Sequence, residues 1–193
     1  GKLLTIQEEA FKHLHALVSL KEESKLDEVA SFIREHFDSE YTIKAETKLK
    51  YQALYDYLNR PLRICGMIPN KGAKGGGPFW KTEARGKSLQ IIEGVELDSS
   101  TPEHVNAIEG STHFNPVIMV CGITDFKGEK FSLYDFRDEQ RFMVSSKTLE
   151  NNQIKILEWP GLWNGGMAQW NTLFIELPSD TFHPVKTVAD LIR

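Results

Sequence analysis

Lys186 is the residue whose setting suggests chemistry most directly. It follows Pro184 and Val185 and precedes Thr187, where a short helix is predicted to begin. Proline fits the entry to a helix, and a threonine hydroxyl can cap the first free N–H groups. A lysine at this position adds charge to a helix end that already favours anions. Lys186 is therefore a candidate catalytic, phosphate-binding residue, and a solvated surface lysine is the ordinary alternative.

A glycine-rich segment over residues 70–80 is the second candidate. Gly75, Gly76 and Gly77 have no Cβ atoms, so successive N–H groups can face an anion or a sugar hydroxyl, and two lysines lie beside them. The segment matches neither the Walker A pattern nor the dinucleotide-binding glycine spacing. It predicts a substrate-binding loop walled by Pro78–Trp80, or else a hairpin connection whose glycines serve the turn.

Three further polar residues accompany predicted strands. Glu93 ends the apolar run 88–92, where burial of a carboxylate requires hydrogen-bond partners. His113 and Asn115 stand at the entrance to a predicted strand over 117–123, and both side chains can donate and accept hydrogen bonds. All three are candidate substrate-binding residues. A stacked histidine and ordinary turn chemistry at the asparagine are the alternatives.

Asn164 lies in the segment 159–171, which holds three of the four tryptophans. Aromatic faces combined with amide hydrogen bonds often grip sugars and bases. Core packing around a tight turn explains the same composition. We take Asn164 as the substrate-binding candidate and the tryptophans as core.

The pattern of apolar residues changes once, near Arg60, and predicts an α/β protein with a mixed sheet flanked by helices and an N-terminal helical cap. Helical periodicity covers residues 3–20, 26–37 and 48–58. Strand-like apolar runs follow over 62–68, 89–92, 117–123, 154–159 and 173–177, and their continuity favours strands covered on both faces. We expect residues 62–177 to form one sheet. The expected division is a helical segment over 1–60 and an α/β region over 61–193.

Composition narrows the class of protein. The net charge of −4 and the absence of a basic tract argue against a nucleic-acid partner. No apolar run is long enough for a membrane span, so we expect no membrane partner. Cys65 and Cys121 lie in apolar runs without metal-ligand spacing and are expected to be buried and reduced, as in a cytoplasmic protein. Because the chain begins with Gly1 rather than methionine, we expect either a residue left by a tag or a fragment of a longer protein.

Several motifs resemble an uncharacterised bacterial family with a domain of unknown function. The matching strings are Cys65-Gly66-Met67, Gly75 to Trp80, Ser88 to Glu93, Thr112 to Val117, Pro160 to Gly165 and Pro184 to Val188. The chain is similar to the C-terminal part of that family, whose full-length members resemble GT-A nucleotidyltransferases.

The order of these motifs is also similar to the second half of a UDP-sugar pyrophosphorylase core. The resemblance implies that Gly76, Gly77, Glu93 and Asn115 contact the sugar of a sugar phosphate or nucleotide-sugar, and that Lys186 meets its phosphate. It further implies nucleotidyl transfer between a nucleoside triphosphate and a sugar-1-phosphate.

The same resemblance implies Mg²⁺ in the full-length protein, with its ligands outside this chain, and a missing N-terminal half that binds the nucleotide. The fragment alone is then expected to be inactive. Two alternatives remain open. One is a non-catalytic sugar-phosphate or nucleotide binding module, and the other is a structural or oligomerisation domain.

Overall fold

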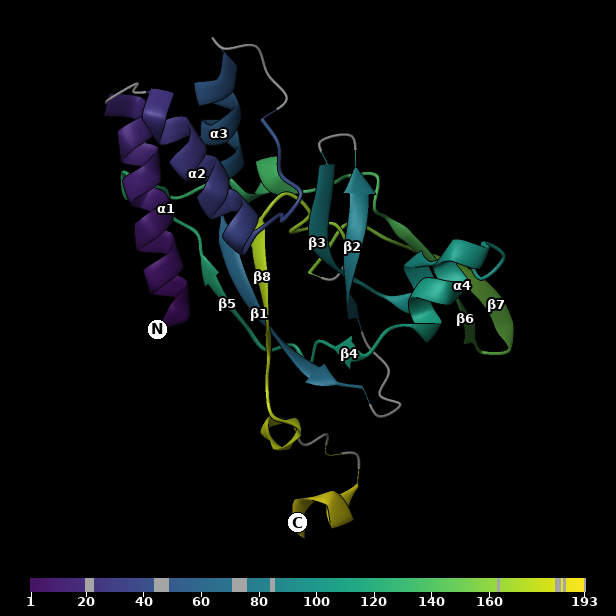
Figure 1. Cartoon of the computed structure of the whole chain (residues 1–193). Helices are drawn as coiled ribbons and strands as arrows, with labels where there is room; N and C mark the ends of the chain where they lie inside the picture. Colours follow the sequence, from purple (N-terminus) through teal and green to yellow (C-terminus); the bar gives the residue numbers. More distant parts are fainter. Residues whose placement is uncertain are drawn as a thin grey trace.

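A computed structural model gives the fold of the chain. It describes residues 1–19, 23–43, 49–70, 76–83, 86–162, 164–182, 185 and 187–192. Figure 1 shows the N-terminal helices on one side, a sheet beside them, and a β-hairpin beyond the sheet. The protein is thus a mixed α/β fold, as the sequence predicts.

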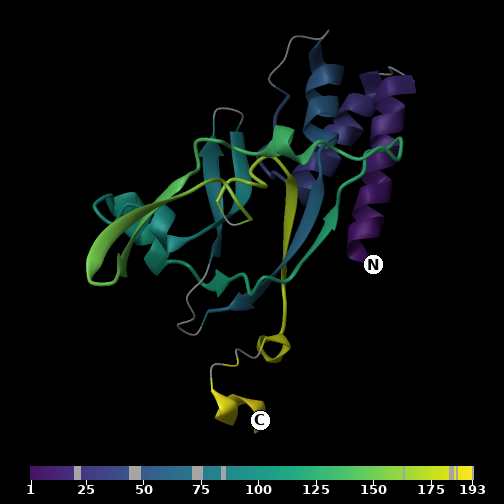
Figure 2. The same ribbon diagram turned by 180° about the vertical axis from the view of Figure 1, so that it is seen from behind.

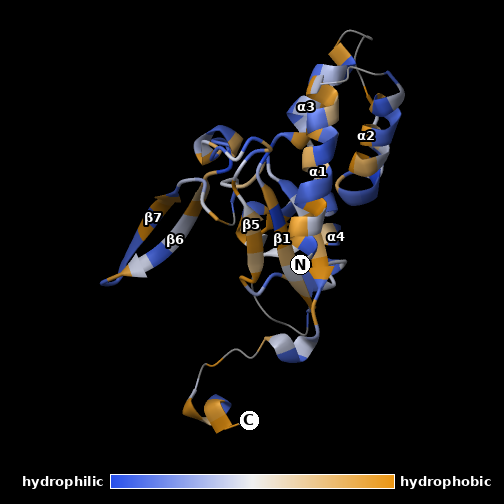
Figure 3. Cartoon of the chain, turned by 90° about the vertical axis from the view of Figure 1, so that its left-hand side faces the viewer, coloured by the Kyte–Doolittle hydropathy of each residue, from blue (hydrophilic) through white to orange (hydrophobic). Residues whose placement is uncertain are grey.

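The first three helices are α1 (Lys2–Ser19), α2 (Glu23–His36) and α3 (Lys50–Leu58). Each presents one apolar face, and Figure 3 shows the alternation of apolar and polar residues along α1 and α2. The predicted helices are confirmed, with ends that differ by a few residues because periodicity fixes helix faces better than helix ends.

The main sheet is built around β1 (Leu62–Pro69). It pairs in parallel with β8 (Asn171–Glu176) on one side, and antiparallel with β5 (Met119–Gly122) and β4 (His113–Phe114) on the other. Seven of the eight β1 residues are buried. Coverage on both faces is therefore confirmed for this central strand.

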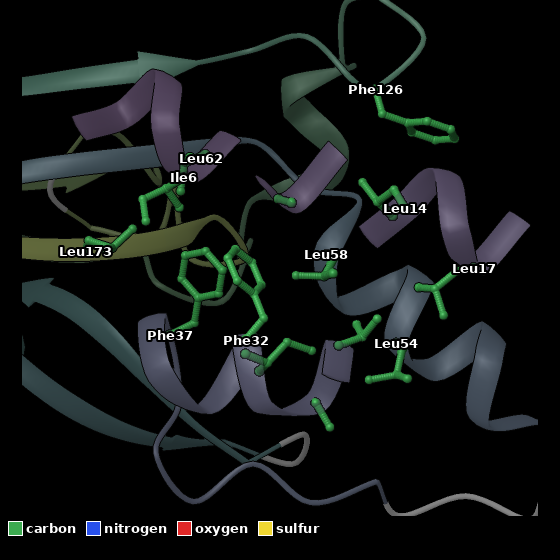
Figure 4. Packing of buried hydrophobic residues seen from close by; sticks show 14 of the residues in the cluster. Ile6, Leu14, Leu17, Phe32, Phe37, Leu54, Leu58, Leu62, Phe126 and Leu173 are labelled. Carbon is green, nitrogen blue, oxygen red and sulfur yellow. The ribbon is translucent and has the colours of Figure 1, made fainter. Parts of the chain in front are cut away.

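The helices pack on one face of this sheet. Leu62, Ile64 and Leu173 of the sheet belong to one apolar cluster with residues of all three helices, and Figure 4 shows Leu62 and Leu173 within it. The cluster thus includes residues from both sides of position 60. The predicted division into two domains at that position stays a prediction.

The opposite face of the sheet is covered by the hairpin of β2 (Gly77–Glu83) and β3 (Gly86–Ile92). Cys65 and Met67 of β1 meet Ile91 of β3 there, in a second and smaller apolar cluster. Complete burial of an apolar side chain such as that of Ile91 or Met67 stabilises the fold by about 1.5–3 kcal/mol. The hairpin is thus held against β1 and β8 by its β3 side.

A second hairpin, β6 (Met143–Leu149) with β7 (Asn152–Glu158), lies beyond α4 (Pro102–Glu109) in Figures 1 and 2. The described strands therefore form one four-stranded sheet and two separate hairpins. The expectation of a single sheet is wrong. Strands that lie next to each other in the sequence pair locally here, and apolar runs do not reveal which strands join a larger sheet.

Two other expectations fail at the periphery. Among the described strands, β5 pairs with β1 alone, and its Cys121 is exposed rather than buried. Strand β7 alternates between exposed and half-buried residues, so it is not covered on both faces. An edge strand and a two-stranded hairpin lack the neighbours that cover a central strand.

Candidate functional site

One cavity at the Gly77 end of the β2–β3 hairpin brings together three of the predicted substrate-binding residues. We call it the Glu93 cavity. Its volume is about 390 Å³, and its lining includes Gly77, Phe79, Glu93, Ser111 and His113. Gly77 begins β2, Glu93 follows β3, and His113 begins β4. Pairing of β2 with β3, and of β4 with β1, places these distant positions around one space.

Gly76 and Gly77 are required by close packing. A Cβ atom at Gly76 would lie 2.5 Å from a methyl group of Ile91, and one at Gly77 would lie 3.0 Å from the Phe79 ring. Real Cβ atoms essentially never approach the first distance, so any larger residue at Gly76 displaces β3. The Gly76 carbonyl also accepts a hydrogen bond from the Asn115 N–H at 2.8 Å. Gly76 joins the hairpin to the loop after β4, while Gly77 lines the cavity.

Glu93 is a carboxylate with a raised pKa. Burial is the largest cause of the raised pKa, and the nearby carboxylates of Glu96 and Glu158 raise it further. Its own N–H donates to the Glu96 carboxylate at 3.2 Å, so the chain turns sharply after β3. A carboxylate on a cavity wall can accept hydrogen bonds from ligand hydroxyl groups.

His113 is fixed by hydrogen bonds through both of its ring nitrogens. The Thr112 hydroxyl lies 2.8 Å from Nδ1, and a Glu176 oxygen lies 3.1 Å from Nε2. In the neutral imidazole, Thr112 donates to Nδ1 and Nε2–H donates to Glu176, whereas in the imidazolium both ring nitrogens donate. The imidazole therefore has a defined orientation at the edge of the Glu93 cavity.

The whole chain matches one protein family. The sequence pattern of a domain of unknown function, DUF4301, matches residues 1–193. The chain belongs to the DUF4301 family. No curated protein matches it. The predicted membership in a domain-of-unknown-function family is confirmed, and the GT-A resemblance stays a prediction.

Asn115, another predicted substrate-binding residue of this DUF4301 chain, is 4% exposed and bonds to the backbone. Its Nδ2 donates to the Gly66 carbonyl at 2.7 Å, and its Oδ1 accepts from the Val117 N–H at 3.0 Å. Val117 has φ of 69°, which is rare for a β-branched residue. The amide thus holds a strained turn between β4 and β5. Its role in substrate binding stays a prediction.

Asn164 is buried in a polar cluster below the cavity. Its Nδ2 donates to the Arg141 carbonyl at 3.0 Å, and its Oδ1 accepts from the Gly161 N–H at 2.9 Å. These bonds account for the buried amide without a ligand. Gly165, with φ of 90°, lies against Arg141 and leaves no room for a side chain.

The Arg141 guanidinium completes this cluster. Nη2 lies 2.6 Å from a Glu96 oxygen, and Nη1 donates to the Gln90 amide oxygen at 3.1 Å. The side chains of Arg141 and Glu96 are only 8% and 12% exposed. This internal ion pair ties the loop before β6 to the turn after β3, and so supports the position of Glu93.

Two predicted site residues, Gly75 and Lys186, lie outside the described residues. The segment after Lys186 forms a short 3-10 helix over Val188–Ile192, and the Asp190 carboxylate accepts from both the Thr187 N–H and its hydroxyl. A short helix is thus present as predicted, but it begins at Val188, and the Thr187 hydroxyl donates to Asp190 rather than capping free N–H groups. Figure 1 shows this C-terminal helix apart from the sheet. The catalytic role of Lys186 stays a prediction.

The described residues also bear on metal and membrane binding. They contain no group of three or more His, Cys, Asp or Glu side chains that could hold a metal ion. They also include no helix that is both long and apolar enough to cross a membrane. The expected Mg²⁺ therefore finds no ligand set in the described part of the chain, and its place in the full-length protein stays a prediction.

Sequence reasoning missed two residues that shape the site. Ser111 lies beside Gly77 in the Glu93 cavity, and Glu176 orients His113. Phe79, which also lines this cavity, belongs to the wall predicted over Pro78–Trp80. Ser111 had a usable signal, because it lies two residues before a polar motif at a strand entrance. Glu176 had none, since its contact spans 63 residues of sequence and depends on β4 and β8 flanking β1.

Proposed function

We propose that this chain supplies the sugar-phosphate side of a site for nucleotidyl transfer between a nucleoside triphosphate and a sugar-1-phosphate. The sugar binds in the Glu93 cavity. One observation carries the proposal: Gly77, Glu93 and His113, predicted as substrate-binding residues from separate motifs, border one cavity of about 390 Å³. Turn chemistry explains each motif singly, but it gives no reason for three of them to meet.

The charge of this cavity favours a sugar over a phosphate. None of the described residues that line it is a lysine or an arginine, whereas Glu93 contributes a carboxylate and Ser111 a hydroxyl. Carboxylates accept hydrogen bonds from sugar hydroxyls and repel phosphate oxygens. Phe79 offers an apolar surface beside them. The ring of the substrate therefore fits this cavity, and its phosphate must lie where a cation is available.

Lys186 is the proposed partner of the phosphate, a role implied by the resemblance to UDP-sugar pyrophosphorylases. In the reaction, an oxygen of the sugar-1-phosphate attacks the α-phosphorus of the triphosphate, and pyrophosphate leaves. Such transfers depend mainly on positioning and on cations that neutralise spreading charge. No step is assigned to Mg²⁺ in this chain, because its described residues offer no ligand set.

A sugar-phosphate binding module without catalysis is the second candidate. The feature that favours it is the Glu93 cavity, whose carboxylate and hydroxyl groups can hold a sugar without any catalytic group. Turnover of UTP by the full-length protein with a series of sugar-1-phosphates separates the two functions. Catalysis is supported if the protein releases pyrophosphate and Lys186→Ala loses that release, while the exposed control Lys155→Ala keeps it. Sugar-phosphate binding without release of pyrophosphate supports the module.

Binding by the chain itself tests the shared part of both proposals. Calorimetric titration with glucose-, galactose- and mannose-1-phosphate should give an affinity that falls at least about tenfold in Glu93→Gln, since a removed charged hydrogen bond costs roughly 1.5–3 kcal/mol. Glu129→Gln is the matched control, because Glu129 is exposed on a distant loop. Equal affinities in both variants, or no binding of any sugar phosphate, would remove the Glu93 cavity from the function.

A further inference from the structure

A second, aromatic cavity adjoins the Glu93 cavity along the same hairpin. We call it the Trp80 cavity. Its volume is about 290 Å³, and its lining includes Phe79, Trp80, Leu89, His113, Phe174 and Glu176. Phe79 and His113 line both cavities. The two spaces are therefore neighbours, separated by one aromatic ring and one imidazole.

The aromatic surface of this cavity is open to water. Trp80 is 52% exposed although it lies in the middle of β2, opposite Leu89 of β3. Phe79 and Phe174 contribute further ring surface. An indole left half in water beside a concavity is a common platform for the apolar face of a sugar ring, because stacking covers the indole while the sugar hydroxyls stay hydrated.

Glu176 gives the platform a polar edge. Its Oε2 lies 3.1 Å from Nε2 of His113, and no other hydrogen bond of its side chain occurs within the described part of the chain. The second carboxylate oxygen can therefore accept a hydrogen bond from a ligand. The Glu176 side chain is 68% exposed, and its bond to His113, which is itself held by the Thr112 hydroxyl at 2.8 Å, places the acceptor beside the rings.

The chemistry of this edge selects among possible ring ligands. A carboxylate oxygen accepts hydrogen bonds, and sugar hydroxyls donate them. A pyrimidine base such as uracil, when attached to a ribose, offers only one N–H donor, and this donor lies between two carbonyl oxygens that a carboxylate repels. A phosphate is repelled by the same charge. A sugar ring, which carries several hydroxyl donors, is thus the ligand that fits the aromatic platform and its acceptor best.

We infer that the Trp80 cavity binds a second sugar ring, so that the ligand is a glycan of at least two linked sugars rather than a single one. The first ring lies in the Glu93 cavity, and the second stacks on Trp80 with a hydroxyl donated to Glu176. The link between the rings passes Phe79 and His113, which border both cavities. This inference rests on the function proposed for the Glu93 cavity.

Titration of the intact chain with matched mono- and disaccharides tests the inference. The probes are methyl glucoside, methyl galactoside and methyl mannoside against maltose, cellobiose, lactose and mannobiose, followed by calorimetry and tryptophan fluorescence. We expect at least one disaccharide to bind about tenfold or more tightly than its monosaccharide, since one stacked ring is worth roughly a tenfold change in affinity.

Variants assign that gain to the Trp80 cavity. Trp80→Ala should remove the disaccharide advantage and leave monosaccharide affinity unchanged, and Trp80→Phe should retain part of it. Trp159→Ala is the matched control, because Trp159 is 70% exposed and follows β7. Glu93→Gln should weaken both classes of sugar, since both place their first ring in the Glu93 cavity.

The outcomes separate the two proposals. Monosaccharide binding that depends on Glu93, without any disaccharide advantage or without its loss in Trp80→Ala, overturns the second ring and leaves the first cavity in place. Failure of every neutral sugar to bind overturns the second ring, and the titration with sugar-1-phosphates then decides the Glu93 cavity separately. Binding of uridine that is lost in Trp80→Ala would assign the Trp80 cavity to a nucleobase and overturn the inference as well.

Discussion

The cavity at the Gly77 end of the β2–β3 hairpin differs in charge from a cavity at the turn end of the same hairpin. The Glu93 cavity has a carboxylate and no lysine or arginine among its described lining residues. The cavity near the turn, which we call the lysine cavity, has a volume of about 440 Å³ and is lined by Arg60, Lys81 and Lys87 together with Asp138. One short hairpin thus presents an acidic and a basic cavity.

The two ends of the hairpin also differ in how far their ion pairs are exposed to solvent. The Arg141–Glu96 pair below the Glu93 cavity is internal, with exposed fractions of 8% and 12%. At the turn end, Lys87 and Glu40 lie 2.8 Å apart but are 43% and 66% exposed. The internal pair belongs to the framework that fixes Glu93. The outer pair is solvated and available for exchange with other ions.

Removal of Arg141 is the strongest test of this difference. Arg141→Leu leaves Glu96 buried without its cation, so the free energy of unfolding should fall by about 3–5 kcal/mol. Urea unfolding of the wild type and the variant measures the loss.

The paired variant Arg141→Leu with Glu96→Leu serves as the control. It leaves no unpaired charge, and should recover a large part of the lost stability. A loss below about 1 kcal/mol in Arg141→Leu alone would mean that the pair behaves like an exposed one, and the contrast between the two hairpin ends would then disappear.

The Asn115 amide gives the second largest expected effect. Asn115→Ala leaves the Gly66 carbonyl and the Val117 N–H without their buried partner, which should lower the unfolding free energy by about 1–3 kcal/mol. Asn106→Ala, on the exposed side of α4, should change it by less than about 0.5 kcal/mol. Thermal and urea unfolding measure both variants. If Asn115→Ala and Asn106→Ala lower the stability equally, the Asn115 bonds do not hold the turn.

The sequence predicts the regular parts of this fold because they bury continuous apolar faces. The three N-terminal helices and strand β1 follow from periodicity and from apolar runs. Strand β2 does not, since Gly77-Pro78 reads as loop and the residues that follow mix aromatic with charged side chains. Helix α4 does not follow either, because its eight residues hold too few apolar positions to show a clear helical period.

The residues of the candidate site likewise include some that the sequence predicts and others whose partners depend on tertiary packing. Glu93 and His113 were predicted from their place at strand ends, and both line the cavity. Asn164 has equally suggestive neighbours in sequence, yet its amide bonds to the backbone. A sequence shows that an amide needs partners, but whether the partner is the backbone or a ligand depends on long-range packing. The contact of Glu176 with His113 likewise depends on the pairing of β4 and β8 with β1.

Titration of Glu93 gives a smaller effect that depends on pH. Burial and neighbouring carboxylates raise its pKa in the folded state above the ordinary value of 4.5. The protonated form is therefore favoured by folding, so this contribution is fully present below 4.5 and is lost as the pH rises through the folded pKa.

Glu93→Gln removes that titration. The variant should be at least as stable as the wild type near neutral pH, and the difference should vanish in acid. Urea unfolding from about pH 4 to about pH 8 measures it, with Glu129→Gln, at an exposed position on a distant loop, as the matched control. A variant that loses stability as the pH rises relative to the wild type would mean that the Glu93 carboxylate is stabilised in the fold rather than strained.

The exposed Lys87–Glu40 pair should give the smallest effect. Lys87→Met removes a solvated contact, and the unfolding free energy should change by about 0–1 kcal/mol. The change should shrink further in about 1 M NaCl, where screening acts over roughly 3 Å, while the Arg141→Leu effect persists because salt does not reach an internal pair. Unfolding of both variants at low and high salt gives the comparison directly. If the Lys87 effect were the larger one, or if salt removed both effects equally, the two hairpin ends would share one kind of electrostatics. Charge would then not distinguish the cavity proposed for sugar from the lysine cavity.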